Sequence, residues 1–235
     1  SGSITRRKYQ VFVTGGIGPG VTSSLFQTVY DQDHTLQTAN PIFDMTVGLF
    51  TESQLVLSST VQAPINGKML FPSQSLMMRE KMDIYRQYAS NLLGSSDAAF
   101  FAPFGSSRTS TTDRHQNDRI DEALFVSFKR LFARDKIKRE TVAFRMFRSG
   151  TQTGTDASPT RNSPNLFETS PLGSVIITDI GAASNIVSTF GGEVGNIVNA
   201  ANTSEVLGLV FYEHGTAVLD MGKLFWSQQV MSGTI

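Results

Sequence analysis

The loop Gly15–Gly20 has the residue types of a phosphate-binding turn. The strand-like segment Tyr9–Thr14 leads into it, and backbone N–H groups in a glycine-rich loop can approach a phosphate closely. However, no lysine follows the loop before Lys68, and Pro19 removes one of the N–H donors. The loop therefore predicts an ordinary strand-ending turn, and a nucleotide-dependent enzyme using Gly15–Gly20 is kept as the weakest alternative.

The three histidines, each near a carboxylate, are the second candidate for chemistry, as metal ligands or acid–base groups. They are His34, His115 and His214. They are far apart in the sequence and form no i,i+4 pair, and no serine lies in a G-x-S-x-G setting. The chain has no cysteine, which excludes disulfide frameworks and thiolate metal sites. We therefore predict no catalytic residue, cofactor site, metal site or small-molecule substrate, and no enzyme.

One segment has a local charge bias. Residues 129–148 hold eight basic side chains and two acidic ones, with Phe132, Phe144 and Phe147 interleaved. Such a run can meet a nucleic acid or an acidic protein surface. The whole chain balances 20 Lys and Arg against 20 Asp and Glu, which argues against a dedicated nucleic-acid binder. Protein–protein contact is the favoured interpretation, and DNA contact is the alternative.

The composition is that of a folded protein with little charge on its surface. Hydrophobic residues make up 40% of the chain and charged residues 17%, below the roughly 25% usual in such domains. The 17 phenylalanines add apolar area that must be buried. No apolar run is long enough to span a bilayer and no signal peptide opens the chain, so a soluble protein is expected. We expect partner chains to cover part of its surface.

Two segments have the spacing of amphipathic helices. Residues 74–93 contain no glycine or proline, carry apolar side chains three and four positions apart, and are followed by Gly94 as a C-terminal cap. Residues 118–135 place Ile120, Leu124 and Phe128 on one face and most charges elsewhere. The spacing thus predicts two principal helices, at about 74–93 and 118–135.

The remaining apolar segments are short and bounded by turn residues, as in antiparallel strands. Strands are predicted within 140–148, 173–180 and 194–198. A hydrophobic hairpin is predicted over 206–220, with a Glu213-His214-Gly215 turn in which Gly215 takes a positive φ. The fold class predicted is α+β, with mostly short antiparallel strands, two principal helices, long loops and a β-rich C-terminal part.

Composition divides the chain into three parts. Residues 1–148 are predicted to form an α+β assembly domain with both helices. Residues 149–172 are rich in Ser, Thr and Pro and predict an extended loop. Residues 173–235 are predicted to be a β-rich segment, with the hairpin, packed on the first part. Because the chain starts at Ser1 and stops without a closing element, we expect a fragment of a longer chain.

The hairpin motif carries a family resemblance. Gly208–Leu219 has the sequence G-L-V-F-Y-E-H-G-T-A-V-L and is preceded by G-E-V-G-N-I-V-N at Gly192–Asn199. This pattern, with the block from Asp118 to Phe147, resembles virion structural proteins of contractile-tailed bacteriophages, in the baseplate and tail-assembly class. The resemblance implies a structural subunit that binds other tail or baseplate proteins and copies of itself in a symmetric assembly.

The same resemblance implies a place in the virion tail, assembled in the host cytoplasm, with no membrane or cofactor. The alternative within this class is a head or neck protein near the portal that contacts DNA through residues 129–148. Protein–protein contacts are usually centred on aromatic and arginine side chains. The interface candidates chosen on that basis, near the second helix and the hairpin, are Phe128, Phe132, Arg134, Arg145, Phe211 and Tyr212.

Overall fold

A computed structural model describes residues 26–30, 36–53, 76–110, 117–129, 136–147, 174–184 and 187–224. The strands are β1 (Phe26–Tyr30), β2 (Pro41–Leu49), β3 (Glu122–Phe128), β4 (Ala143–Phe147), β5 (Ser174–Thr178), β6 (Val187–Thr189), β7 (Gly192–Asn199), β8 (Asn202–Phe211) and β9 (Thr216–Asp220). The helices described are α2 (Leu76–Leu93) and the single turn α4 (Met221–Leu224). The fold class is thus the predicted one, α+β and rich in β-strands.

The nine described strands form one antiparallel sheet. Its order is β1-β2-β3-β9-β8-β7-β5-β4, and β6 pairs with β7 beside β5. The centre of the sheet joins distant parts of the chain, because β9 pairs with β3 from Ala123↔Asp220 to Ser127↔Thr216. The described strands before and after residues 149–172 therefore belong to the same sheet, and those residues themselves lie outside the described ranges.

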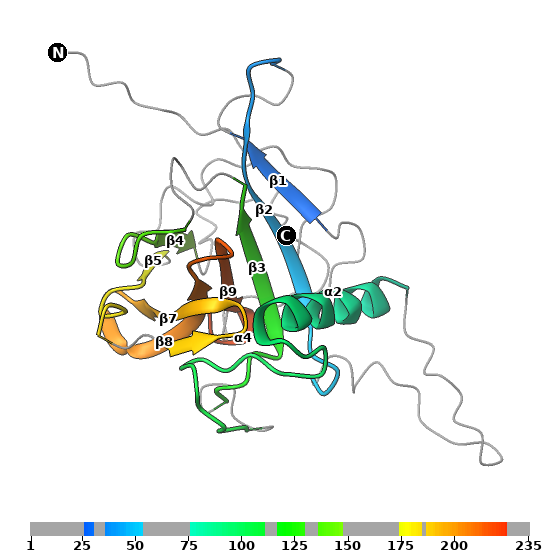
Figure 1. Cartoon of the computed structure of the whole chain (residues 1–235), viewed down its shortest axis with the longest axis vertical. Helices are drawn as coiled ribbons and strands as arrows, with labels where there is room; N and C mark the ends of the chain where they lie inside the picture. The colour runs from blue at the N-terminus through cyan, green and yellow to red at the C-terminus, as the bar shows by residue number, and fades with distance from the viewer. Residues whose placement is uncertain are drawn as a thin grey trace, which may run out of the picture.

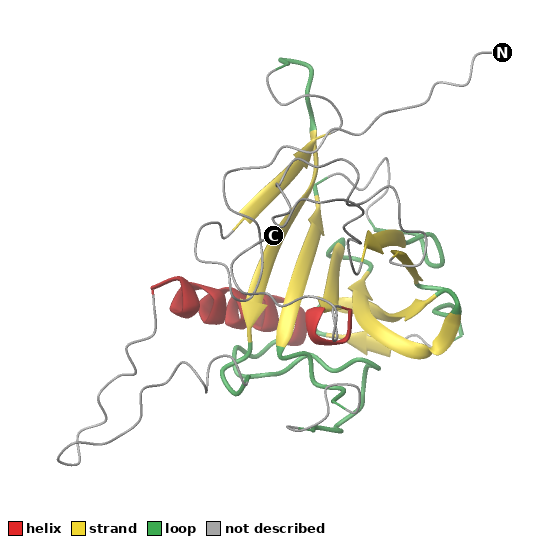
Figure 2. Cartoon of the chain, turned by 180° about the vertical axis from the view of Figure 1, so that it is seen from behind, coloured by secondary structure: helices red, strands yellow, loops and turns green. Residues whose placement is uncertain are grey.

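The sheet curls into a half-barrel, as Figures 1 and 2 show from opposite sides. The ring of Phe128 on β3 stacks on that of Phe144 on β4, with centroids 6.0 Å apart, although four strands separate β3 and β4 in the sheet order. Phe43 on β2 meets the edge of Phe128 at 5.9 Å. These three half-buried aromatic side chains close the mouth of the curl.

Both faces of the central strands are buried. On the concave face, Leu124 and Val126 of β3 join an inner core with Val210 of β8 and other apolar side chains. On the convex face, the alternate residues Ala123 and Phe125 join an outer core beneath helix α2. The middle residues of β3, β8 and β9 are therefore apolar on both faces rather than alternating with polar residues.

Helix α2 lies across the convex face (Figure 1) and buries Tyr85, Ala89 and Leu92, the apolar face predicted from its spacing. The Tyr85 hydroxyl accepts a hydrogen bond from the Phe100 amide and donates one to the Ile120 carbonyl, both at 2.9 Å. Tyr85 thus joins the helix to the connecting segment between α2 and β3.

The predictions for the two long helices had different outcomes. The helix at 74–93 is confirmed from Leu76 to Leu93, and Gly94 ends it with a φ of 82°. The helix predicted at 118–135 is wrong where the structure describes it, because Glu122–Phe128 is strand β3. Its apolar residues fit a helical spacing because a strand buried on both faces is apolar at nearly every position, which includes every third and fourth one.

The predicted β-segments are confirmed where they are described. The hairpin over 206–220 consists of β8 and β9, and Gly215 has a φ of 62°. The segments 140–148, 173–180 and 194–198 contain β4, β5 and β7. The strand predicted at Tyr9–Thr14 lies outside the described residues.

Candidate interaction surface

The turn between β8 and β9 reaches the surface while its ends stay buried. Glu213 and His214 are exposed, whereas the flanking Tyr212 is fully buried. The Gly215 carbonyl accepts a hydrogen bond from the Phe128 amide at 2.9 Å, and the Tyr212 carbonyl accepts one from the Ile137 amide at 2.9 Å. The turn is therefore held by its neighbours on two sides.

A buried carboxylate supports this turn from below. Asp179 has no exposed surface and accepts hydrogen bonds from the Tyr212 hydroxyl at 2.9 Å, the Val142 amide at 3.0 Å and the Glu140 amide at 2.7 Å. Burial, together with the Asp179 carboxylate, raises the pKa of the Tyr212 phenol, so the phenol keeps its proton and donates. Asp179 thus joins β5, β8 and the segment before β4 through one side chain.

Glu193 at the start of β7 binds two cations beside the turn. Its carboxylate lies 3.2 Å from the Lys136 ammonium and 2.5 Å from the Arg139 guanidinium. Hydrogen bonds from Arg139 and then Lys136 lower the pKa of the Glu193 carboxyl. Since the Glu193 carbonyl also accepts the Tyr212 amide at 3.0 Å, the charged group is fixed next to the β8–β9 turn.

Phe190, in the turn between β6 and β7, is the most exposed of the large apolar side chains that the structure describes, at 76%. Its backbone is nevertheless held in place. The Gly191 amide donates to the Leu92 carbonyl at 2.9 Å, and the Thr189 hydroxyl donates to the same carbonyl at 3.3 Å. The ring lies against Gly94, where a built Cβ atom would come within 3.1 Å of it. An aromatic ring is thus displayed on a turn fixed to the end of α2.

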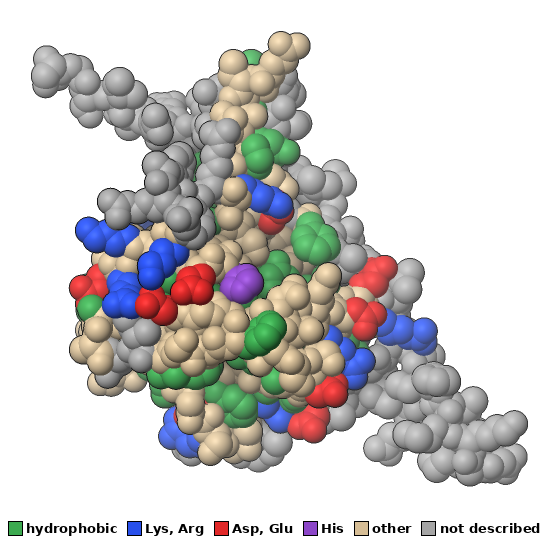
Figure 3. All heavy atoms as spheres, viewed as in Figure 1, with side chains coloured by type: hydrophobic (Ala, Val, Ile, Leu, Met, Phe, Trp, Pro, Cys, Tyr) green, Lys and Arg blue, Asp and Glu red, His purple; other side chains and the backbone are tan. Residues whose placement is uncertain are grey.

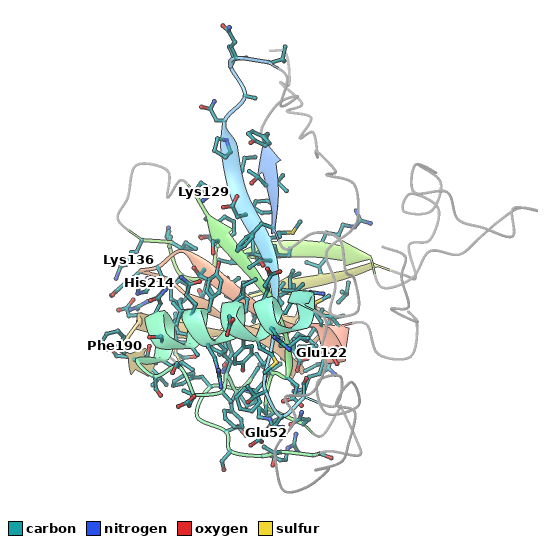
Figure 4. All side chains as sticks on the ribbon, turned by 90° about the vertical axis from the view of Figure 1, so that its right-hand side faces the viewer. Glu52, Glu122, Lys129, Lys136, Phe190 and His214 are labelled. Carbon is teal, nitrogen blue, oxygen red and sulfur yellow. The ribbon has the colours of Figure 1, made fainter. Side chains whose placement is uncertain are left out.

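These features lie on one side of the molecule. In Figure 4 the labelled Lys129, Lys136, His214 and Phe190 follow one another along the left-hand edge, away from Glu122 and Glu52. Figure 3 shows acidic and basic side chains gathered beside the histidine on the same face. We call this surface the turn face and define it by Phe190, Glu193, Glu213, His214, Lys136 and Arg139.

The basic run of the sequence is partly neutralised where it is described. Lys136 and Arg139 pair with Glu193, and Lys129 lies 2.5 Å from a carboxylate oxygen of Asp44. A cation that is already paired attracts a phosphate backbone less, because its field is cancelled locally. This pairing weighs against DNA contact through the described part of 129–148.

The six interface candidates are placed very differently by the structure. Phe211 and Tyr212 are wrong as surface residues, because both are fully buried in the sheet centre. Phe128 is half-buried in the aromatic mouth of the curl, and Arg145 is exposed on β4. Phe132 and Arg134 lie outside the described residues. None of the four candidates that the structure describes lies on the turn face, although Tyr212 supports it from beneath.

Sequence reasoning missed Phe190. The available signal is the order Thr189-Phe190-Gly191-Gly192, an aromatic residue placed directly before two glycines. Gly192 has a φ of 86°, and a side chain there would overlap the Glu213 carboxylate. The two glycines allow this tight turn and the close approach of Gly191 to the Leu92 carbonyl, so the residue before them is held at the surface.

A second polar cluster lies where β9 meets α4. The Lys223 ammonium, 3.4 Å from the Asp118 carboxylate and 3.2 Å from the Ala102 carbonyl, is buried with its partners. Asp118 also accepts the Ser106 hydroxyl at 2.7 Å. The neighbouring Asp220 accepts the Lys223 amide, and burial raises the pKa of its carboxyl to about 7. This cluster holds α4 on the segment that connects α2 to β3.

The stability of the Asp220→Asn variant relative to wild type is expected to be higher at about pH 8 than at about pH 5. An unfolded aspartate ionises near pH 4, so between about pH 4 and 7 the folded state holds the proton and stability falls as pH rises. Asparagine cannot ionise, so its advantage should grow by about 2–4 kcal/mol across that range. Urea midpoints of both proteins at the two pH values measure it. An unchanged difference would contradict the expectation.

The other predicted sites have simple outcomes. His214 is an exposed turn residue, whereas His34, His115 and the loop Gly15–Gly20 lie outside the described residues. Among the residues that the structure places, no group of three His, Cys, Asp or Glu side chains is arranged to hold a metal ion. Within the same ranges, no helix is long and apolar enough to cross a membrane.

No protein-family model, curated protein or solved structure matches this chain.

Proposed function

We propose that this protein is a structural subunit of a contractile bacteriophage tail, with the baseplate as its place, and that it acts by protein–protein contacts rather than by catalysis. The observation that carries the proposal is the display of Phe190 at 76% exposure on a backbone fixed to α2. An exposed aromatic ring on a rigid turn suits a lasting protein–protein contact, because the turn loses little conformational entropy when a partner covers the ring.

The hairpin gives independent support. The motif Gly208–Leu219, which resembles virion structural proteins, spans the C-terminal end of β8 and most of β9 in the middle of the sheet. Its Glu213-His214 turn lies on the turn face, next to Glu193. The part of the motif that reaches the surface therefore belongs to the same surface as Phe190.

The proposal is tested on particles made by the genome that encodes the chain. Purified virions are expected to contain the protein by mass spectrometry, and immunogold labelling is expected at the far end of the tail. The major capsid protein serves as the positive control and an abundant host protein as the negative one. Absence of the chain from virions would overturn the proposal.

The same experiment separates the alternative. Label at the head–tail junction, together with DNA binding by the purified chain that weakens steeply with salt, would favour a head or neck protein. The carboxylate partners of Lys129, Lys136 and Arg139 are the reason to expect no such binding near ~50 mM salt.

A further inference from the structure

The exposure of Phe190 and its fixed backbone together indicate a contact point. Most of the ring is in water, yet the turn that carries it makes two hydrogen bonds to the Leu92 carbonyl. Aromatic side chains that are covered by a partner often dominate the energy of an interface, and a side chain held in place loses less freedom on binding. Val187, 44% exposed at the start of the same hairpin, adds apolar surface nearby.

The charges around Phe190 indicate what kind of surface covers it. Lys136 and Arg139 are positive, and Glu193 and Glu213 are negative, so the surroundings carry both signs in equal number. A contact between two copies of one surface brings that surface onto itself. A surface of one sign would then repel its copy. Here Lys136 and Arg139 share the single Glu193 carboxylate and together keep one positive charge, which the Glu213 carboxylate of a second copy can meet.

The charge of the whole chain agrees with contact between copies. Its formal net charge is zero, so two copies approach each other without the long-range repulsion of strongly charged proteins. A nucleic acid would instead need cations without carboxylate partners. A lipid surface would need several apolar side chains grouped without acidic neighbours.

We propose that the turn face binds the turn face of a second copy across a two-fold axis, with the two Phe190 rings at the apolar centre and the charges of both signs at the rim. This inference rests on the proposed function in that it takes protein contact as the protein's activity. The partner is thereby a second copy of this chain, not another virion protein.

The first test is self-association of the purified chain, measured by sedimentation from about 1 to 100 µM. Wild type is expected to form a dimer in a concentration-dependent way. Phe190→Asp is expected to weaken the dimer at least about 30-fold, as for a central aromatic residue. The matched control is Phe26→Asp, which changes a phenylalanine that is 53% exposed on β1, far along the sheet order, and should leave the dimer intact.

Circular dichroism of each variant shows whether it folds. The inference is overturned by a wild-type chain that stays monomeric at the highest concentration. It is equally overturned by a folded Phe190→Asp variant that dimerises as well as wild type.

The second test uses the absence of cysteine from the chain. Ser188→Cys introduces a single thiol two residues before Phe190 and leaves the ring in place. A two-fold axis near Phe190 brings two such thiols close together, so a short bismaleimide is expected to give a covalent dimer. Gln37→Cys, at an exposed position in the segment before β2 and far from Phe190 in the sheet order, is the control for random collisions and should give much less. Equal cross-linking at both positions would overturn the inference.

The two proposals fail separately. A chain found in virions but monomeric in solution, with Phe190 needed to capture a different tail protein, overturns the dimer and leaves the proposed function. A chain that dimerises through Phe190 but is absent from virions overturns the proposed function and leaves the dimer.

Discussion

Asp179→Ala is expected to destabilise the protein by about 3–5 kcal/mol, since three hydrogen-bond donors lose a buried acceptor at once. The Tyr212 hydroxyl and the Val142 amide are both buried, so water cannot replace the carboxylate without opening the core. The Glu140 amide also loses its partner, at a residue whose φ of 57° is unusual for a side chain other than glycine. The β8–β9 turn and the start of β4 should loosen together.

Urea unfolding followed by circular dichroism measures this loss. Tyr212→Phe removes one of the three donors and should lower the free energy of unfolding by only about 1–2 kcal/mol. Asp83→Ala, at an exposed position of α2, is the matched control and should change it by less than about 0.5 kcal/mol. If Asp179→Ala and Asp83→Ala unfold at the same urea concentration, Asp179 does not have the role assigned to it.

Gly48→Val is expected to destabilise the protein by about 3 kcal/mol or more, because it forces helix α2 away from the sheet. A Cβ atom built on Gly48 would lie 2.7 Å from Cε2 of Phe125 and 3.0 Å from Cα of Tyr85. The second contact is with helix backbone, so no side-chain rotation can relieve it. The helix must shift, and with it the Tyr85 hydroxyl that bonds Phe100 and Ile120.

The check is a thermal or urea unfolding curve, with the protection of the Phe100 amide from hydrogen exchange as a local readout. Ala143→Val adds a β-branched side chain at an exposed position of strand β4 and serves as the control. It should leave stability nearly unchanged. A Gly48→Val protein with native stability and native protection at Phe100 would contradict the close approach of α2 to β2.

Elements with strong local signals were predictable from the sequence. Helix α2 has apolar residues three and four positions apart with charged residues between them, and its end at Gly94 is marked by a residue suited to a positive φ. The β8–β9 hairpin has apolar runs on both sides of a glycine turn. In both, neighbours in the sequence decide the conformation.

Elements that depend on distant contacts were not predictable in this way. Strand β3 has apolar residues on both faces because α2 covers one and the curl of the sheet covers the other, and neither is visible in the local spacing. Phe211 is buried for the same reason. Strands β7 and β9 flank its strand, and the centroid of the Phe100 ring lies 6.0 Å from that of the Phe211 ring. A hydrophobic hairpin needs a partner, and here the partner is the rest of the chain.

The pairing of β3 with β9 has a consequence for synthesis on the ribosome. Ala123 pairs with Asp220, so strand β3 is made long before the strand that completes its hydrogen bonds. Until β9 emerges, the growing chain carries an apolar strand with one unpaired edge, which is the kind of surface on which nascent chains aggregate. Closing so long a loop is also slow. Truncation before Thr216 should therefore yield insoluble protein, and chaperone demand during translation should be high.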